Sequence, residues 1–124
     1  MNKQIEAALA RDDTIDITTI GRKSGQPRRI EIWFRRVAGR TYITGTPGTR
    51  AWYANMVANP NFTFHLKQSH QADLPATAHP ILDASERRRI MSDPVMSWYH
   101  ANSESLDAMV ANSPLVEVIF EEER

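Results

Sequence analysis

Apolar and polar residues alternate with a period of two along much of the chain, and this pattern predicts β-strands. The strands expected from the alternation, and from the β-branched and aromatic residues in it, are 15–20, 30–35, 40–44, 62–67, 72–81 and 115–120. The segment 62–67 is the clearest of them, because Phe62, Phe64 and Leu66 occupy alternate positions. Such a strand has one face in the core and one face toward solvent.

Two of these strands carry features that bear on their position in a sheet. In 30–35, Ile30, Ile32 and Phe34 share one face, which we expect to be the buried face. In 72–81, Pro75 cannot donate a ladder hydrogen bond, and it therefore indicates an edge strand or a bulge.

Helical periodicity and capping signals predict short helices in the rest of the chain. The expected helices are 2–11, 50–58 with Thr49 as N-cap, 83–91 with a capping box from Asp83 to Glu86, a stretch after Pro94, and one that begins at Ser103 and ends before Pro114. Trp52, Met56 and Val57 are expected on the inner side of the second helix. The three arginines at 87–89 are interpreted as a solvated helix face.

The order of these elements predicts an α+β fold. A meander of about six mainly antiparallel strands with short connections tends to close into a small barrel, here with helices at its side and end. The last strand, 115–120, is suited to close a sheet begun near the N-terminus. Residues 1–124 are expected to form a single domain, because this length suffices for one hydrophobic core.

Composition limits the classes of function. Lys plus Arg number 15 and Asp plus Glu number 15, so the net charge is zero and a protein dedicated to nucleic acid or to membrane surfaces is not expected. The absence of cysteine excludes disulfides, thiolate catalysis and cysteine-based metal sites. No signal-peptide core or membrane-spanning run is found, and we expect a cytoplasmic protein.

Two segments in the first half of the chain predict contact with an anion. Residues 21–29, Gly-Arg-Lys-Ser-Gly-Gln-Pro-Arg-Arg, carry four cationic side chains on a glycine-hinged turn. Residues 44–50 form a loop of Gly, Pro and Thr that follows a strand and opens into a helix, and a helix start presents unpaired backbone N–H groups. Together they indicate a phosphorylated ligand; the alternative is that both are solvated turns.

Other chemistries lack their sequence signals. His65, His70, His79 and His100 show no metal-ligand spacing, so no metal site is expected, and His65 is interpreted as a barrel residue with satisfied hydrogen bonds. No nucleophile elbow, nucleotide phosphate loop or Rossmann fingerprint is found. Catalysis would then depend on a bound organic cofactor.

The order and spacing of several short motifs resemble the deazaflavin-dependent nitroreductase family. The matching segments are 18–28 (Thr-Thr-Ile-Gly-Arg-Lys-Ser-Gly-Gln-Pro-Arg), 45–48, 51–55 (Ala-Trp-Tyr-Ala-Asn) and 58–60 (Ala-Asn-Pro), with further likeness at 72–76 and 113–116. The resemblance is close over residues 18–67. It implies a split β-barrel related to the pyridoxamine-phosphate-oxidase-like, FMN-binding barrels, which often form homodimers.

The same resemblance implies a site for coenzyme F-420, an 8-hydroxy-5-deazaflavin that carries a phosphodiester and a polyglutamate tail. By motif position, the tail and phosphate would be met by Arg22, Lys23, Gln26 and Arg28. The phosphate and the ring edge would lie along the loop made of Thr44, Gly45, Thr46, Pro47, Gly48, Thr49 and Arg50. The ring system would contact Ala51, Trp52 and Asn55. Arginine suits this role, because its planar fork pairs with carboxylate or phosphate through two hydrogen bonds.

The activity implied by the resemblance is transfer of a hydride from the reduced deazaflavin to a small-molecule acceptor. The acceptor would be a quinone, a nitro compound or another conjugated molecule, and the barrel would orient it and exclude water. Aromatic candidates for the acceptor pocket and for proton delivery are Trp33, Tyr42, Trp98 and Tyr99. Each of them can also be an ordinary core residue, and the sequence does not choose among them.

The loop at 45–50 departs from the family pattern. It is shorter than in many members and lacks their lysine, so Arg50 would have to replace that residue. This leaves open the same barrel with FMN, haem or another tetrapyrrole-like ligand. A third hypothesis is a non-catalytic module that binds an anion or RNA through the arginine patch, although the neutral charge of the chain disfavours RNA.

Overall fold

The computed structural model describes residues 1–121, and in this part of the chain seven strands form one sheet. The strands are β1 (Thr14–Ile20), β2 (Pro27–Trp33), β3 (Arg35–Val37), β4 (Arg40–Thr44), β5 (Asn61–Leu66), β6 (Ala72–Pro80) and β7 (Leu115–Phe120). Their order is β2-β1-β5-β6-β7-β4-β3, and every neighbouring pair is antiparallel. The helices are α1 (Lys3–Arg11), α2 (Ala51–Ala58), α3 (Ala84–Met91), the 3-10 turn η1 (Pro94–Met96), α4 (Ser97–Ala101) and α5 (Leu106–Asn112).

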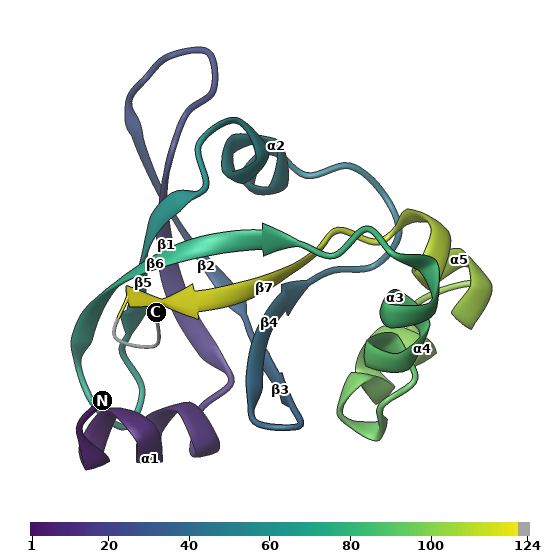
Figure 1. Ribbon diagram of the computed structural model, residues 1–124, viewed down its shortest axis with the longest axis horizontal. Helices are drawn as coiled ribbons and strands as arrows, with labels where there is room; N and C mark the ends of the chain where they lie inside the picture. Colours follow the sequence, from purple (N-terminus) through teal and green to yellow (C-terminus); the bar gives the residue numbers. More distant parts are fainter. Residues whose placement is uncertain (122–124) are drawn as a thin grey trace.

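The sheet curls because its two edge strands, β2 and β3, are consecutive in the chain. A single residue, Phe34, separates them, and its N–H donates to the carbonyl of Asp13 at 2.9 Å. Since β2 pairs with β1 and β3 pairs with β4, the two ends of the strand order meet at Phe34 (Figure 1). The predicted α+β fold is confirmed. The count is seven strands rather than about six, because the predicted strand 30–35 is interrupted at Phe34.

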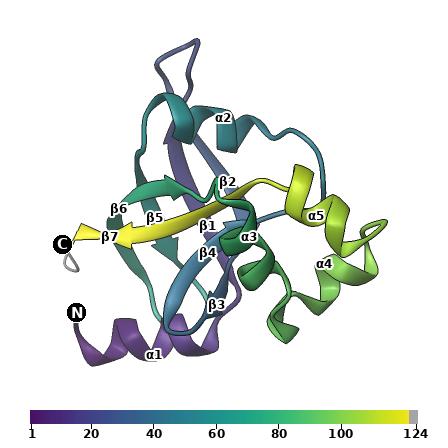
Figure 2. The same ribbon diagram turned by 45° about the vertical axis from the view of Figure 1, so that its right-hand side comes forward.

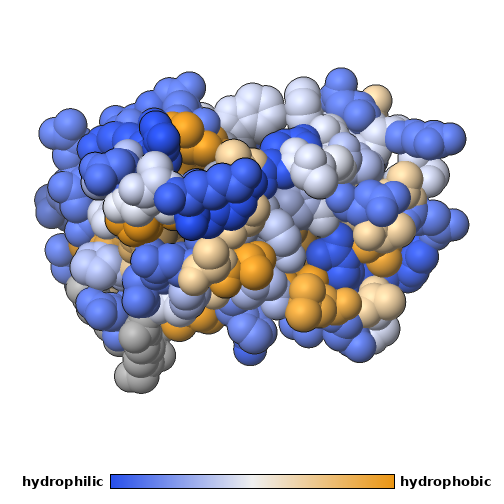
Figure 3. Space-filling view, turned by 90° about the horizontal axis from the view of Figure 1, so that it is seen from above, coloured by the Kyte–Doolittle hydropathy of each residue, from blue (hydrophilic) through white to orange (hydrophobic). Residues whose placement is uncertain are grey.

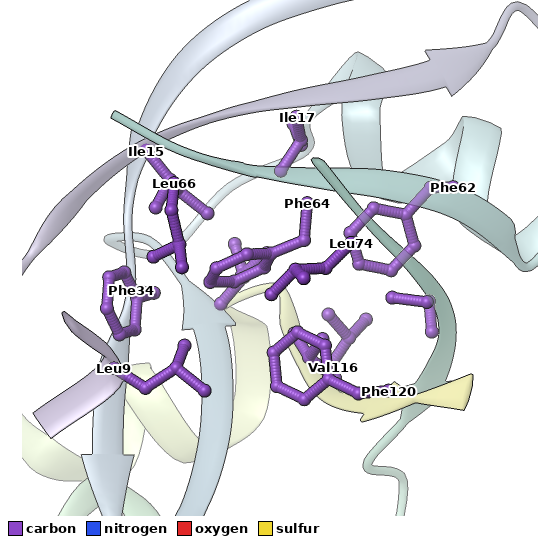
Figure 4. Close-up of a cluster of buried hydrophobic side chains, with 14 of the residues drawn as sticks. Leu9, Ile15, Ile17, Phe34, Phe62, Phe64, Leu66, Leu74, Val116 and Phe120 are labelled. Atoms are coloured by element: carbon purple, nitrogen blue, oxygen red, sulfur yellow. The ribbon is translucent and has the colours of Figure 1, made fainter. Parts of the chain in front are cut away.

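The main core lies on the concave side of the sheet and is covered at one end by α1. Asn2 caps this helix, since its Oδ1 accepts from the N–H of Ile5 at 2.8 Å. Edge-to-face contacts join Phe34 to Phe64 at 5.3 Å and Phe64 to Phe120 at 5.1 Å between ring centroids (Figure 4). In two views α1 lies at the opposite end of the barrel from α2 and the β1–β2 turn (Figures 1 and 2).

A second core lies between the strands β3 and β4 and the helices α3, α4 and α5. Its buried members are Val37, Tyr42, Ile81, Ile90, Met91, Met96, Tyr99, Met109, Val110 and Leu115. The helix start predicted at Asp83 is confirmed, because the Asp83 carboxylate caps α3 by accepting from the N–H of Glu86 at 2.9 Å.

Arg87 corrects the interpretation of 87–89 as a solvated face. Its side chain is buried and donates to four backbone carbonyls, those of Ile81, Met109, Val110 and Ser113. Three of these carbonyls lie at the end of α5, where the last carbonyls of a helix lack intrahelical N–H partners, although that of Met109 also accepts from the N–H of Ser113 at 3.0 Å. Arg88 and Arg89 are exposed, as expected.

Strands β2 and β6 lie differently from their predicted positions. Strand β2 is an exposed edge strand in which Ile30 is 40% exposed, so the expected burial of its isoleucine face is wrong. Phe34 is buried, and it lies between the end of β2 and the start of β3 rather than within a strand. Strand β6 lies between β5 and β7 and is no edge, but its pairing with β7 begins at Ala76, so Pro75 stands at the end of that ladder.

The starts of α2 and α5 also differ from the predictions. Helix α2 begins at Ala51 with Arg50, not Thr49, as N-cap, and no side chain makes a capping hydrogen bond. Val57 is 56% exposed, and Asn55 instead lies on the inner side of α2. Helix α5 begins after Ser105, whose hydroxyl caps it, later than the predicted start at Ser103.

Few large apolar side chains are exposed among residues 1–121. They are Ile30, Trp33, Val57, Leu82, Val95 and Trp98. Seen from above, apolar patches alternate with hydrophilic surface (Figure 3). Over the described residues, none of the helices has both the length and the apolar character needed to span a membrane.

Candidate functional site

The Asn55 side chain ties the basic turn to α2. Its Oδ1 accepts from the backbone N–H of Arg22 at 3.0 Å, and its Nδ2 donates to the hydroxyl of Thr19 at 3.3 Å. The turn itself is closed by the N–H of Gly21, which donates to the carbonyl of Gln26 at 2.9 Å. A Cβ at Gly21 would lie 2.5 Å from the Ser24 hydroxyl, so a larger residue there would displace the Ser24 side chain.

A hollow of 360 Å³ lies between this turn and α2, and we call it the basic hollow. Its lining residues are Thr19, Gly21, Arg22, Lys23, Ser24, Arg28, Ile30, Ala51, Trp52 and Asn55. The side chains of Arg22, Lys23 and Arg28 are exposed, and they make no hydrogen bond or ion pair within residues 1–121. Three uncompensated positive charges at the basic hollow attract an anion.

A second hollow of 390 Å³ lies between β2, the loop after β4 and α4, and we call it the aromatic hollow. Its lining residues are Ile30, Glu31, Ile32, Trp33, Thr44, Gly45, Thr46, Arg50, Trp52, Trp98 and Tyr99. The Trp33 and Trp98 rings meet edge to face at 4.9 Å, and Trp98 and Tyr99 meet at 5.3 Å. The Arg35 guanidinium lies 5.3 Å from the centroids of both Trp33 and Tyr99, a distance at which a cation attracts a ring face.

The two hollows share a wall. Ile30 and Trp52 line both of them, so the basic hollow and the aromatic hollow adjoin and can be described together as a basic end and an aromatic end. Trp52 is 7% exposed, and its indole is held in the main core rather than free to turn. We use the name groove below for the basic and aromatic hollows together.

Arg50 folds back over the loop that precedes α2. Its Nη2 donates to the carbonyl and the hydroxyl of Thr46 at 3.0 and 3.1 Å, and its Nη1 donates to the carbonyl of Thr49 at 3.2 Å. All of these acceptors are neutral, so the charge of Arg50 is not compensated by them. Since α2 also lacks a side-chain cap, positive charge and free N–H groups coincide at the helix start.

Most of the residues predicted for the site line the groove. At the basic end these are Arg22, Lys23, Arg28, Ala51, Trp52 and Asn55, and at the aromatic end they are Trp33, Thr44, Gly45, Thr46, Arg50, Trp98 and Tyr99. Gln26 does not line it, and its backbone carbonyl closes the turn instead.

Other predicted site residues lie elsewhere. Pro47, Gly48 and Thr49 line a different hollow behind the loop, which Arg50 also borders. Tyr42 is fully buried in the second core and is not brought to the groove. Burial raises the pKa of Tyr42. Ile30 was not among the site residues expected from the sequence, and it lines both hollows from the exposed edge strand β2.

Tyr99 is the one tyrosine in the lining of the groove. It is 3% exposed, and burial raises the pKa of its phenol, although the nearby Arg35 opposes the rise. The phenol is therefore protonated at neutral pH and can donate a proton.

The interpretation of His65 is confirmed. Its Nε2 lies 2.7 Å from the hydroxyl of Thr18, and its Nδ1 lies 2.6 Å from a carboxylate oxygen of Asp73. Within residues 1–121, no three His, Asp or Glu side chains gather closely enough to hold a metal ion.

Comparison with solved structures identifies the fold as a split β-barrel. A conserved hypothetical protein, Rv2991 from Mycobacterium tuberculosis, aligns with a TM-score of 0.74 and 16% identity over 98% of this chain and 81% of that one. A protein described as an F420 reductase aligns at 0.65 and 17% identity over 97% and 95% of the two chains. A putative pyridoxamine 5'-phosphate oxidase from Listeria innocua aligns at 0.67 and 14% identity over 94% and 90%.

The match to a family model shows family membership as well as a shared fold. The model is described as F420H(2)-dependent quinone reductase, and it matches residues 1–110, which include all the residues of the groove. This match confirms the resemblance that the motifs in 18–60 indicated. The chain therefore belongs to the F420H(2)-dependent quinone reductase family, a family of oxidoreductases.

Proposed function

We propose that this protein transfers a hydride from reduced 8-hydroxy-5-deazaflavin to a quinone, a nitro compound or another conjugated acceptor, and that the groove is the site. Family membership supports the use of a deazaflavin. The observation that carries the proposal is the wall of Ile30 and Trp52, which joins a basic hollow to an aromatic one. A coenzyme with a flat ring at one end and an acidic tail at the other matches both ends of such a groove.

The basic end fits the acidic part of the coenzyme. Arg22, Lys23 and Arg28 have no acidic partner within residues 1–121, so binding of an anion breaks no existing ion pair. The neighbouring Arg29 is different, because it already binds the Asp16 carboxylate at 3.0 Å. Charge-assisted hydrogen bonds to carboxylate or phosphate are about twice as strong as neutral ones.

The middle of the groove fits a flat ring. Ile30 and Trp52 offer apolar contact there, and the loop from Thr44 to Thr46 borders the aromatic end. The uncapped start of α2 and the Arg50 guanidinium adjoin this loop and favour a negative group at the ring edge.

The coenzyme supplies the hydride, so the protein needs no nucleophile or metal of its own. The residues of the chain bind and orient both molecules and keep water from the aromatic hollow. Trp33 and Trp98 offer ring edges and faces against which a flat acceptor can pack. The Tyr99 phenol, protonated at neutral pH, is suited to give a proton to the reduced acceptor.

The experiment compares two double variants with equal changes of charge. Arg22→Ala with Lys23→Ala removes two cations from the basic hollow, and Lys3→Ala with Arg11→Ala removes two exposed cations from α1 at the far end of the barrel. In a fluorescence titration, the first variant should bind deazaflavin roughly tenfold more weakly than the wild type. The α1 variant should bind as the wild type does.

The same titration with FMN tests the cofactor. Tighter binding of FMN than of deazaflavin by the wild type would contradict the proposal. Equal losses of deazaflavin affinity in both double variants would show that only net charge matters and that Arg22 and Lys23 make no specific contact.

A further inference from the structure

A hollow of 720 Å³ lies behind the loop 47–50, on the side away from the groove. Besides this loop, its walls come from α2, from the residues that follow β6 and from the end of α5. Much of the lining is apolar, with Pro47, Ala54, Ile81, Leu82 and Pro114 among its members. Leu82 is 78% exposed, so a large apolar side chain stands in water at this hollow.

Arg87 places a buried positive charge in the wall of this rear hollow. Four of its N–H donations go to carbonyls of Ile81, Met109, Val110 and Ser113, and none goes to a carboxylate. Arginine keeps its proton in proteins, so these four bonds satisfy four of its five N–H donors and leave the charge uncompensated. Burial lowers the pKa of Arg87, and the phenol of Tyr53, another lining residue, opposes this fall.

Two further polar side chains in the lining are incompletely paired within residues 1–121, because Arg50 has no ionic partner and the Ser113 hydroxyl has no hydrogen-bond partner. Arg50 bonds only to neutral oxygens of Thr46 and Thr49. Ser113 is 4% exposed, and its hydroxyl has no hydrogen-bond partner within residues 1–121. The lining contains no Asp or Glu. A buried hydroxyl without a partner is unfavourable and gains free energy from a ligand that satisfies it.

The rear hollow is separated from the groove by a fixed loop. The N–H of Gly48 donates to the carbonyl of Asn112 at 3.1 Å, which fastens the loop to the end of α5. Gly48 has a φ of +134°, a backbone conformation that favours glycine. The Arg50 guanidinium fills the inside of the loop, 3.1 Å from the position of a Cβ on Gly48.

From these observations we infer that the rear hollow is a second binding site, and that it takes a small organic anion with a carboxylate on an aliphatic body. The carboxylate is attracted by the charges of Arg50 and Arg87, and the aliphatic body covers Leu82 and the apolar wall. This site goes beyond the proposed reductase function and does not depend on it.

The test is calorimetric titration of the full chain with octanoate in the absence of deazaflavin. Octan-1-ol keeps the aliphatic body without the charge, and inorganic phosphate keeps a charge without the body. Octanoate should bind at one saturable site. Octan-1-ol and inorganic phosphate should each bind at least roughly tenfold more weakly, because the first lacks the charge and the second lacks the apolar contact.

Two variants locate the site. Leu82→Glu removes an apolar contact and adds a charge that repels the carboxylate, so octanoate affinity should fall roughly tenfold or more. Val57→Glu is the matched control, because Val57 is also an exposed apolar residue but lines none of the three hollows. It should leave octanoate affinity unchanged.

Absence of saturable octanoate binding overturns the inference, and so does equal affinity for octanoate and octan-1-ol. Octanoate affinity that is the same in Leu82→Glu and the wild type also overturns it, as does competition between octanoate and deazaflavin for one site. Failure of deazaflavin to bind would contradict the proposed function alone, since the octanoate titration contains no deazaflavin.

Discussion

At the scale of single residues, the Asn55 side chain decides where the basic turn lies. It is buried and bonds to the backbone of Arg22 and to the hydroxyl of Thr19, so it positions the turn without contributing any charge. The family motif identified Asn55 as a ring contact, but only the structure shows this second role. Spacing along the chain does not reveal which side chain crosses from a helix to a turn.

Replacement of Asn55 by Ala should weaken both stability and deazaflavin binding. The lost pair of hydrogen bonds in a buried place should cost about 1–3 kcal/mol of the free energy of unfolding. Deazaflavin affinity should fall further than in Asn59→Ala, a variant of a nearby asparagine whose side chain accepts only from the N–H of Asn61. Urea unfolding and fluorescence titration measure the two effects. Equal affinity in both variants would show that the position of the turn does not matter for binding.

Arg87 shows the limit of sequence interpretation at this scale. Three arginines in a row on a short helix indicate a solvated face, and two of the three are solvated. The third is buried because the carbonyls at the end of α5 lie beside α3, a tertiary contact that no local pattern contains.

Arg87→Met should therefore destabilise the protein far more than Arg88→Met does. Loss of Arg87 removes a donor from four buried carbonyls, of which only that of Met109 keeps another donor, the N–H of Ser113, and this should cost roughly 3 kcal/mol or more. Arg88 makes one surface ion pair, with Asp107 at 2.7 Å, and its loss should cost about 1 kcal/mol or less. Similar unfolding midpoints for the two variants in urea would contradict the role given to Arg87.

At the scale of elements, β2 shows why an alternating pattern can mislead. Alternation in β2 is real, but the strand is at the edge of the sheet and is covered by no other layer, so its apolar residues stay accessible. That exposure is what makes Ile30 available to the groove. Strand type and approximate position could be predicted from the sequence, whereas the layer that covers a strand depends on the whole topology.

Charged side chains hold β1, β2 and the end of β5 together on the outer face of the sheet. Asp16 binds Arg29 at 3.0 Å and Lys67 at 2.7 Å, and Lys67 also binds Glu31. The hydrogen bond from Lys67, followed by that from Arg29, holds the pKa of Asp16 below its ordinary value of 3.8, against a rise from partial burial.

This carboxylate should make stability depend on pH on the acid side. Because its pKa is lower in the folded state, Asp16 stabilises the protein above its ordinary pKa, and the contribution is lost as the pH falls through the folded value. Asp16→Asn should lower the free energy of unfolding at pH 7 by no more than about 1 kcal/mol, because the pair is partly exposed. Its stability should then fall less between pH 5 and roughly pH 2 than that of the wild type.

Denaturant unfolding at several pH values measures this difference. Asp107→Asn is the control, since Asp107 makes one exposed surface pair with Arg88. If the free energy of unfolding fell equally with acid pH in the wild type and in Asp16→Asn, the role given to Asp16 would be contradicted.

At the scale of the whole molecule, the chain is neutral and yet has a basic hollow on its surface. The net charge is zero, so attraction of an anionic ligand depends on local placement rather than on total charge. Within the described part of the chain, Arg22, Lys23 and Arg28 have no carboxylate partner, while Arg29, Arg40 and Arg88 each pair with a carboxylate. A count of charges along the sequence could not separate these two groups.

The fold and the family could be predicted from the sequence, while the division of the loop 44–50 between two hollows could not. The motif placed all seven loop residues at one ligand. In the structure, Thr44, Gly45 and Thr46 face the groove, and Pro47, Gly48 and Thr49 face the rear hollow. Arg50 borders both because its side chain turns back over the loop, which depends on its bonds to Thr46.

The central claim is that one deazaflavin molecule occupies both ends of the groove, and amide NMR during a titration tests it most directly. The backbone N–H signals of Arg22, Lys23 and Ser24 should shift together with those of Gly45, Thr46 and Trp52, with a single dissociation constant, while signals from α1 stay in place. Shifts at only one of the two ends, or two different dissociation constants, would contradict the claim.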